Sequence, residues 1–233
     1  MAVKILTSNF KNGFPNEVAA RMNALIADRK SFVFIASEFY KSSDKNDRYF
    51  NAVLKMFSDI DIRFDHAFLI DGRLPKERAQ KIIDIADVIW LAGGDTPNQF
   101  QSLKDFDLTN RLKTSDAVII GMSAGAINMG KTAVCSITCG HDYYTAYEAL
   151  GLVNISIEPH FDAEIVSQEL LSISEKYPLI GLCDDSAIIV DCEKYERIGD
   201  VFWLENQTVT PIFDMSLVFD NKIKFEPNKT PLI

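Results

Sequence analysis

Asp116-Ala-Val-Ile-Ile-Gly121-Met-Ser123-Ala-Gly125-Ala-Ile-Asn-Met-Gly130 is the stretch of sequence that decides the predicted fold. Ala117–Ile120 is a short apolar run, which predicts a buried strand. The G-x-S-x-G pattern of Gly121–Gly125 follows directly, and the next residues can begin a helix. Such a turn exposes one side chain at its apex, and its glycines avoid collisions with the neighbouring backbone. The pattern predicts either a nucleophilic Ser123 or an ordinary strand-to-helix turn.

The residues before this stretch alternate between apolar segments and helical patterns. Strands are predicted at Val3–Thr7, Ser31–Ala36, Arg63–Leu69 and Val88–Leu91, and helices at Asn16–Lys30 with Asn16 as cap, at Asp44–Ser58, from Pro75, and from the cap Thr96 through Leu103. Apolar strands alternating with helices predict a parallel sheet covered on both faces. We therefore expect a three-layer α/β fold with a mostly parallel sheet. Ligands bind at the carboxyl ends of such strands, where Ala92–Thr96 and Gly121–Gly125 both fall.

The pattern changes after Gly130. Short strands are predicted at Thr132–Ile137, Gly151–Ile157, Leu179–Leu182, Ala187–Val190 and Val201–Leu204, and a helix at Asp162–Tyr177. The sequence contains no linker-like segment, low-complexity segment or internal repeat, so residues 1–233 are expected to form a single domain. The tail from about residue 222, which includes Pro227 and Pro231, is expected to pack loosely.

Composition excludes several classes of protein. A net charge of −9 and the lack of a basic stretch argue against a nucleic-acid-binding protein. No segment approaches the ~20 apolar residues that span a bilayer, and the apolar run at the N-terminus is too short for a secretion signal. Cys135 and Cys139 lack a second Cys/His pair at zinc-site spacing. We therefore expect a cytoplasmic protein without a metal, a cofactor, a nucleic-acid partner or a membrane partner, and a homodimer is left open.

A nucleophilic serine needs a base to take its proton, and histidine is the usual base. The chain has three histidines, His66, His141 and His160. His160 follows a predicted strand and precedes a helix, which places it at the carboxyl edge beside Ser123. His141 lies in a polar and aromatic loop, and His66 lies at the beginning of a strand, on the opposite edge. Position therefore favours His160 as the base.

A catalytic histidine is oriented by a carboxylate, and the developing negative charge is stabilised by backbone N–H groups. The candidate carboxylates are Asp142, Glu158, Asp162, Asp184 and Asp185. Asp184 and Asp185 follow the strand Leu179–Leu182 and so fall at the same edge as His160. The N–H of Ala124 is a natural oxyanion donor, and Gly93-Gly94 either supplies a second donor or only turns the chain.

Four segments of the chain can be compared with a known family: Trp90-Leu-Ala-Gly-Gly-Asp-Thr96 with Asn98-Gln99-Phe100, Gly121-Met-Ser-Ala-Gly-Ala126, Pro159-His160, and Gly181-Leu-Cys-Asp-Asp-Ser-Ala187. In this order they resemble the peptidase E (aspartyl dipeptidase) and cyanophycinase family of serine peptidases. The resemblance implies a fold similar to that of class I glutamine amidotransferases, which is flavodoxin-like.

The same resemblance implies roles for particular residues. Ser123 would be the nucleophile and His160 the base, with Gly93, Gly94 and Ala124 around the oxyanion; Asp95 in the same loop is a further candidate substrate-binding residue. Asp184 occupies the position at which family members often carry a glutamate, and Asp142 is the alternative acid. Aspartyl dipeptidases of this family bind the substrate with an arginine after the histidine. The segment Phe161–Val190 contains no arginine, and its only cation is Lys176, so a strong preference for aspartyl substrates is not expected.

Three functions are compatible with these features. The first is a serine peptidase that hydrolyses short peptides through an acyl-enzyme, and we prefer it. The second is an esterase of the α/β-hydrolase type, which shares the G-x-S-x-G pattern. That fold usually carries its histidine close to the C-terminus, whereas no histidine follows His160. The third is a non-catalytic family member that binds a small ligand, supported only by the replacement of glutamate by Asp184.

Overall fold

The computed structural model describes residues 2–137, 143–192 and 194–216. Its larger sheet has seven strands in the order β11-β10-β1-β5-β4-β2-β3. The strands are β1 (Lys4–Thr7), β2 (Ser31–Ile35), β3 (His66–Ile70), β4 (Val88–Leu91), β5 (Val118–Met122), β10 (Ala187–Asp191) and β11 (Lys194–Ile198). The strands β1 to β5 are parallel, and β10 and β11 are antiparallel to their neighbours. The mostly parallel sheet is confirmed.

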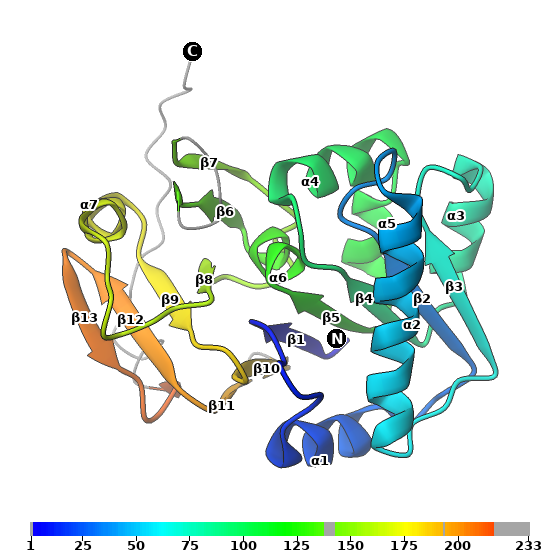
Figure 1. Ribbon diagram of the computed structural model, residues 1–233, viewed down its shortest axis with the longest axis horizontal. Coiled ribbons are helices and arrows are strands. Elements are labelled where there is room, and N and C mark those ends of the chain that lie inside the picture. Colours follow the sequence, from blue (N-terminus) through cyan, green and yellow to red (C-terminus); the bar gives the residue numbers. More distant parts are fainter. Residues whose placement is uncertain (1, 138–142, 193, 217–233) are drawn as a thin grey trace.

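Helices cover both faces of this sheet. They are α1 (Asn16–Leu25), α2 (Ser43–Asp59), α3 (Lys76–Asp84), α4 (Thr96–Asp105), α5 (Thr109–Thr114) and α6 (Ala124–Met129). Figure 1 shows α1 and α2 on one face and α3, α4 and α5 on the other. Crossovers between parallel strands are right-handed, so the direction in which the chain moves across the sheet decides which face a helix covers. The chain moves in one direction from β1 to β3 and in the other from β3 to β5, which places the later helices on the opposite face. The predicted three-layer α/β fold is confirmed.

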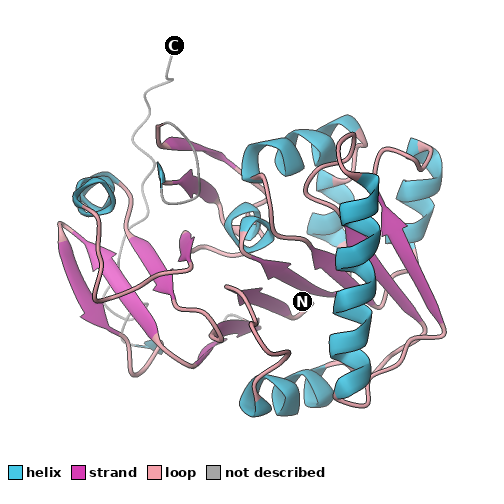
Figure 2. Ribbon diagram, viewed as in Figure 1, coloured by secondary structure: helices cyan, strands magenta, loops and turns pink. Residues whose placement is uncertain are grey.

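A second sheet of four strands lies beside the first, in the order β13-β12-β9-β8 (Figure 2). Its strands are β8 (Ile157–Pro159), β9 (Leu179–Leu182), β12 (Val201–Glu205) and β13 (Thr208–Pro211). The helix α7 (Gln168–Lys176) contacts β12. A separate two-stranded sheet is formed by β6 (Thr132–Cys135) and β7 (Thr145–Glu148). One cluster of buried apolar residues runs through both larger sheets, from Ile5 of β1 to Ile180 of β9. None of the described helices combines the length and hydrophobicity that crossing a bilayer requires.

Several predicted boundaries were wrong. The helix predicted at Asn16–Lys30 ends at Leu25, because Ile26 leaves helical dihedral angles (φ −92°, ψ 82°), and its N-cap is Pro15. The helix predicted at Asp162–Tyr177 begins only at Gln168, where Ser167 caps it by accepting a hydrogen bond from the Leu170 N–H. The strand predicted at Gly151–Ile157 is reduced to β8, at Ile157–Pro159. The strands β7, β11 and β13 were missed because their partly exposed sequences lack an apolar run.

Candidate active site

Ser123 lies at the apex of the turn between β5 and α6. Its φ of 50° and ψ of −109° are unusual for a residue with a side chain. Its N–H donates to the Thr7 carbonyl oxygen of β1 at 2.9 Å, which holds the turn against the neighbouring strand. A backbone in such a region costs about 1–3 kcal/mol and is found mostly at functional sites. The strand-to-helix turn predicted from the G-x-S-x-G pattern is therefore present.

The two glycines of the pattern allow close packing around this turn. A Cβ placed on Gly125 would lie 2.1 Å from the Leu91 carbonyl oxygen of β4. A Cβ placed on Gly121 would lie 2.7 Å from the Ala126 nitrogen. Both neighbours are backbone atoms, which cannot move aside without shifting a strand or a helix.

Gly125→Ala is expected to destabilise the protein by about 1–3 kcal/mol, the usual cost of forcing extra volume into a packed region. The midpoint of urea unfolding measures this loss. Gly13→Ala serves for comparison, because a Cβ there meets nothing within 4 Å and its φ of 85° leaves only backbone strain, about 1–2 kcal/mol, without steric overlap. Equal midpoints for Gly125→Ala and the wild type would contradict the close approach to Leu91.

His160 follows β8 at the edge of the four-stranded sheet. Its Nε2 lies 3.0 Å from the Ser123 Oγ, within hydrogen-bonding distance. Its φ of 55° is again in the left-handed region, which turns the ring toward the serine. The structure thus brings together the two residues that sequence position favoured as nucleophile and base, although 37 positions separate them in the chain.

Asp184 lies on the other side of the imidazole ring. Its Oδ1 is 2.8 Å from the His160 Nδ1, so a neutral ring with its proton on Nδ1 can donate to Asp184 and accept the serine proton at Nε2. Burial would raise the pKa of the Asp184 carboxyl, but hydrogen bonds from His160, Ser8 and Lys11 outweigh it and hold the pKa below its ordinary value. The carboxylate therefore stays charged, and its contribution to stability is lost only as the pH falls through this lowered pKa.

Ser8 and Lys11, in the loop after β1, complete the surroundings of Asp184. Ser8 is fully buried; its hydroxyl donates to Asp184 Oδ1 at 2.9 Å and accepts the His160 backbone N–H at 2.7 Å. The Lys11 ammonium lies 3.2 Å from Asp184 Oδ2 and is 64% exposed. Sequence reasoning missed both residues, although Ser8 directly follows a predicted strand and so falls at the carboxyl edge.

The glycine loop after β4 lies against the turn at Ser123. A Cβ on Gly93 would be 3.4 Å from the Ser123 Cβ. Gly94 has a φ of +137°, and a Cβ there would lie 2.1 Å from the Ser37 Oγ, so a side chain is excluded. Asp95 caps α4 by accepting the Asn98 N–H at 2.9 Å, which corrects the prediction that Thr96 is the cap.

A buried amide network connects this loop to α6. The Gln99 side chain donates to the Ala92 carbonyl oxygen, immediately before the glycines, at 2.9 Å. The Asn128 side chain of α6 donates to the Gln99 Oε1 at 3.1 Å and accepts the Tyr147 hydroxyl at 2.8 Å. Gln99 and Asn128 are both fully buried. The network therefore fixes the position of Gly93-Gly94 relative to the helix that carries Ala124.

The remaining candidates lie elsewhere. His66 begins β3 at the amino end of the sheet. Glu158 is buried and accepts a hydrogen bond from Ser136, and Asp162 accepts the Glu164 N–H in its own loop. Asp185 accepts the Lys11 N–H at 3.3 Å. His141 and Asp142 lie outside the described residues, and within those residues no group of three or more His, Cys, Asp or Glu side chains could hold a metal ion.

The family model of peptidase family S51 matches residues 5–198, which is most of the chain. The chain belongs to peptidase family S51. It is therefore a serine peptidase, as the resemblance implied. No curated protein matches its sequence.

Solved structures share the fold of this S51 peptidase. A peptidase from an acI-B1 Actinobacterium superposes with a TM-score of 0.69 at 16% identity, covering 92% of this chain and 95% of that one. A candidate peptidase E from Listeria monocytogenes EGD-e superposes with a TM-score of 0.64 at 19% identity, covering 85% of this chain and 98% of that one. At these identities the likeness concerns the fold.

Proposed function

We propose that this S51 peptidase hydrolyses short peptides through an acyl-enzyme, with Ser123 as nucleophile, His160 as general base and Asp184 as the orienting carboxylate. The observation that carries the proposal is the chain of two contacts, 3.0 Å from Ser123 Oγ to His160 Nε2 and 2.8 Å from His160 Nδ1 to Asp184 Oδ1. Aspartate is one methylene shorter than the glutamate common in the family, yet it reaches the ring at hydrogen-bonding distance. This favours Asp184 over Asp142 as the acid.

The proposed mechanism follows the usual triad chemistry. His160 Nε2 takes the Ser123 proton as Oγ attacks the peptide carbonyl, and Asp184 stabilises the imidazolium that forms. The oxyanion is bound by the N–H of Ala124 and by an N–H of the Gly93-Gly94 loop. The imidazolium then gives its proton to the leaving amine, which breaks the C–N bond. Water, activated by the same histidine, hydrolyses the acyl-enzyme and restores Ser123.

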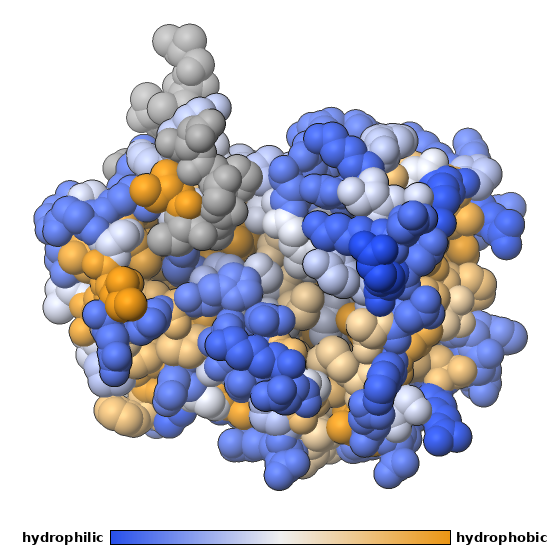
Figure 3. All heavy atoms as spheres, viewed as in Figure 1, coloured by the Kyte–Doolittle hydropathy of each residue, from blue (hydrophilic) through white to orange (hydrophobic). Residues whose placement is uncertain are grey.

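Short peptides are the proposed substrates. Lys11 is the cation closest to the triad among the contacts that the structure describes, but its ammonium is paired with Asp184 Oδ2 rather than held free for a substrate carboxylate. We therefore keep the expectation that aspartyl substrates are not strongly preferred. Figure 3 shows hydrophilic residues near the centre of the face seen in Figure 1, with hydrophobic residues exposed on both sides of them.

A fluorophosphonate probe with intact-mass and peptide analysis tests the nucleophile. The expected result is one adduct, on Ser123. An adduct at another residue, or none, would overturn the assignment. Comparing unblocked di- and tripeptides with p-nitrophenyl esters distinguishes a peptidase from an esterase: turnover of esters alone would favour the α/β-hydrolase type of activity.

Ser8→Ala is expected to lower kcat by about 10-fold to 100-fold and to leave KM nearly unchanged. The variant leaves the His160 N–H without its partner and removes a donor from Asp184, and leaving one buried group unpaired costs about 1–3 kcal/mol. Steady-state kinetics on a peptide substrate provides the measurement. Because Ser8 acts through Asp184 and His160, Ser8→Ala should lower kcat by a much smaller factor in an Asp184→Asn background. Additive losses would show that Ser8 acts independently of the triad.

A further inference from the structure

Lys4 is a buried lysine at the amino-terminal end of the parallel strands, opposite to the end of the sheet where the proposed active site lies. It is the first residue of β1, a central strand, and only 8% of it is exposed. Its partners across the sheet are apolar, Ile119 on β5 and Val190 on β10. Lysine is rarely buried to this extent unless an opposite charge accompanies it, because removing an ammonium from water is costly.

The described residues do not supply that opposite charge at contact distance. Asp116, in the turn before β5, acts on Lys4 through space without forming an ion pair with it. Burial lowers the pKa of Lys4 from 10.5 to about 8, and the attraction of Asp116 offsets only part of this effect. At pH 7 the ammonium is therefore still mostly protonated, and its charge is poorly compensated.

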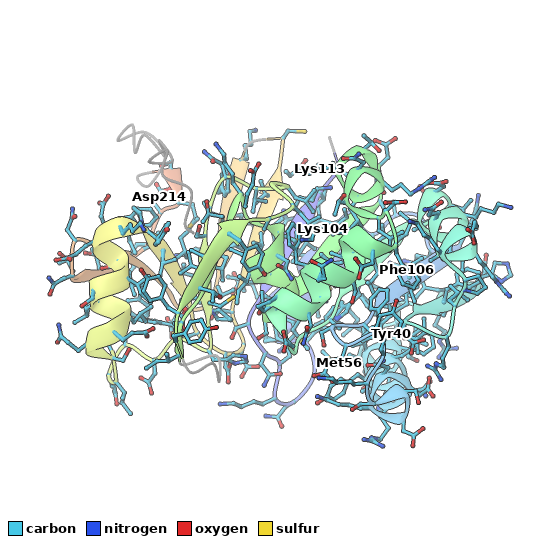
Figure 4. The ribbon with its side chains drawn as sticks, turned by 90° about the horizontal axis from the view of Figure 1, so that it is seen from above. Tyr40, Met56, Lys104, Phe106, Lys113 and Asp214 are labelled. Atoms are coloured by element: carbon cyan, nitrogen blue, oxygen red, sulfur yellow. The ribbon has the colours of Figure 1, made fainter. Side chains whose placement is uncertain are left out.

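Lys4 faces a hollow of about 540 Å³ at this end of the sheet. Its other charged side chains are Lys113, Lys131 and Asp116. Lys113 comes from α5 and Lys131 follows α6, so three separate segments each contribute a lysine to the lining of one hollow. Figure 4 shows Lys113 near the rim of the molecule, with Lys104 on the neighbouring α4. Three lysines against one aspartate make this place locally positive, whereas the whole chain carries −9.

We propose that this hollow binds a small anion with two or more negative charges, carried by phosphate or carboxylate groups, with Lys4 as the anchoring cation. Ser115 and Asn154, which also line the hollow, can donate further hydrogen bonds. Bound oxygens would give the Lys4 ammonium the partner that the described residues do not provide. Charge-assisted hydrogen bonds of this kind are about twice as strong as neutral ones. The site is distinct from the Ser123 site and does not depend on the proposed function.

The competing explanation is that Lys4 only extends its ammonium to water along an apolar stem. Lys113 and Lys131 would then serve to neutralise the carboxyl-terminal ends of α5 and α6. This explanation predicts no saturable binding of anions, and so the two can be separated by measurement.

Isothermal titration calorimetry of the full chain with inorganic phosphate and, separately, with succinate tests the proposal at constant ionic strength. We expect saturable binding of at least one anion at pH 7, weakened at least tenfold by Lys4→Met. The matched control is Lys104→Met, which removes an exposed ammonium that lies over the Phe100 ring and should leave the affinity unchanged. Preference between the two anions distinguishes a phosphate ligand from a carboxylate ligand. The absence of saturable binding of both, or equal binding by Lys4→Met, would overturn the proposal.

A second measurement needs no knowledge of the natural ligand. Because the folded-state pKa of Lys4 lies below its ordinary value, the penalty of burying its charge is fully present below pH 8 and disappears as the pH rises toward 10.5. Lys4→Met should therefore be more stable than the wild type at pH 7, and this difference in the free energy of unfolding should decrease between pH 8 and 10.5. A saturating concentration of the anion should also decrease the difference at pH 7. The other titratable groups of the hollow, Lys113, Lys131, Asp116, Cys192 and Tyr195, are present in both proteins, so the comparison removes their contributions except for the part that comes from their interaction with Lys4, such as the attraction of Asp116. Lower stability of Lys4→Met at pH 7 would contradict the uncompensated charge.

Discussion

Ser123→Ala is expected to lower kcat for peptide hydrolysis by about 10⁶-fold, the loss seen when a triad enzyme loses its nucleophile. The proposed acyl-enzyme cannot form without Oγ, whereas His160 and Asp184 keep their mutual hydrogen bond. KM should change little, because the hydroxyl contributes to the transition state more than to binding. Single-turnover assays with mass detection of products would measure the residual rate. A residual activity above a few per cent would show that another residue is the nucleophile.

Ser123→Gly provides the matched variant for this experiment. Both variants lack the hydroxyl, but only glycine adopts the positive φ of this turn without a steric penalty. Glycine also increases the conformational entropy of the unfolded chain, which lowers the free energy of unfolding by about 0.4–1 kcal/mol. This loss offsets part of the stability gained by relieving the backbone strain. We therefore expect the glycine variant to be at least as stable as the alanine variant in urea unfolding, and equally inactive. Alanine being clearly the more stable of the two would contradict the strained backbone at Ser123.

Asp184→Asn is expected to lower kcat by about 10⁴-fold, as does loss of the carboxylate in other serine peptidases. An asparagine amide that donates to His160 Nδ1 would leave the ring with its proton on Nε2, so the nitrogen facing Ser123 could no longer accept a proton. Lys11 would also lose the negative oxygen with which it pairs at 3.2 Å. The pH dependence of kcat, together with the single-turnover rate, measures the effect.

Asp185→Asn is the control for this change. Asp185 is adjacent in the chain and has a φ of 63°, which asparagine tolerates, but its carboxylate accepts a bond from the Lys11 N–H instead of contacting His160. Its activity should stay near that of the wild type. Asp142→Asn tests the alternative acid. If Asp142→Asn lost activity and Asp184→Asn retained it, the assignment of the acid would be reversed.

The central part of the fold was predictable because it depends on local signals. The apolar runs around Ile35, Trp90 and Ile120 are each long enough to mark a buried parallel strand, and helical patterns separate them. Because parallel strands end at one edge of a sheet, the sequence predicted Ser123, His160 and Asp184 together as candidates. The structure instead places β8 and β9, which precede His160 and Asp184, in the second sheet, and the sequence did not predict this division. The weak strands β11 and β13 carry few apolar residues, and so their pairing is decided by neighbours distant in the sequence.

The surroundings of the triad could not be predicted for a similar reason. Ser8 is an ordinary small residue in the sequence, and its importance comes from contacts with residues 152 and 176 positions away. Gln99 and Asn128 likewise look like polar surface residues, yet both are fully buried within one hydrogen-bonded network. Nothing local distinguishes such residues, because their burial results from packing of α4 against α6.

The three proposed catalytic residues are divided between the two larger sheets. Ser123 follows β5 of the seven-stranded sheet, His160 follows β8 of the four-stranded sheet, and Asp184 lies on the connection from β9 to β10 that joins them. A small rotation of one sheet against the other would separate Oγ from Nε2 while each sheet kept its own hydrogen bonds. Partial openings of this kind require less free energy than global unfolding. Mild denaturant should therefore inactivate the enzyme before its circular dichroism changes. Loss of activity would then report a change in the alignment of the two sheets.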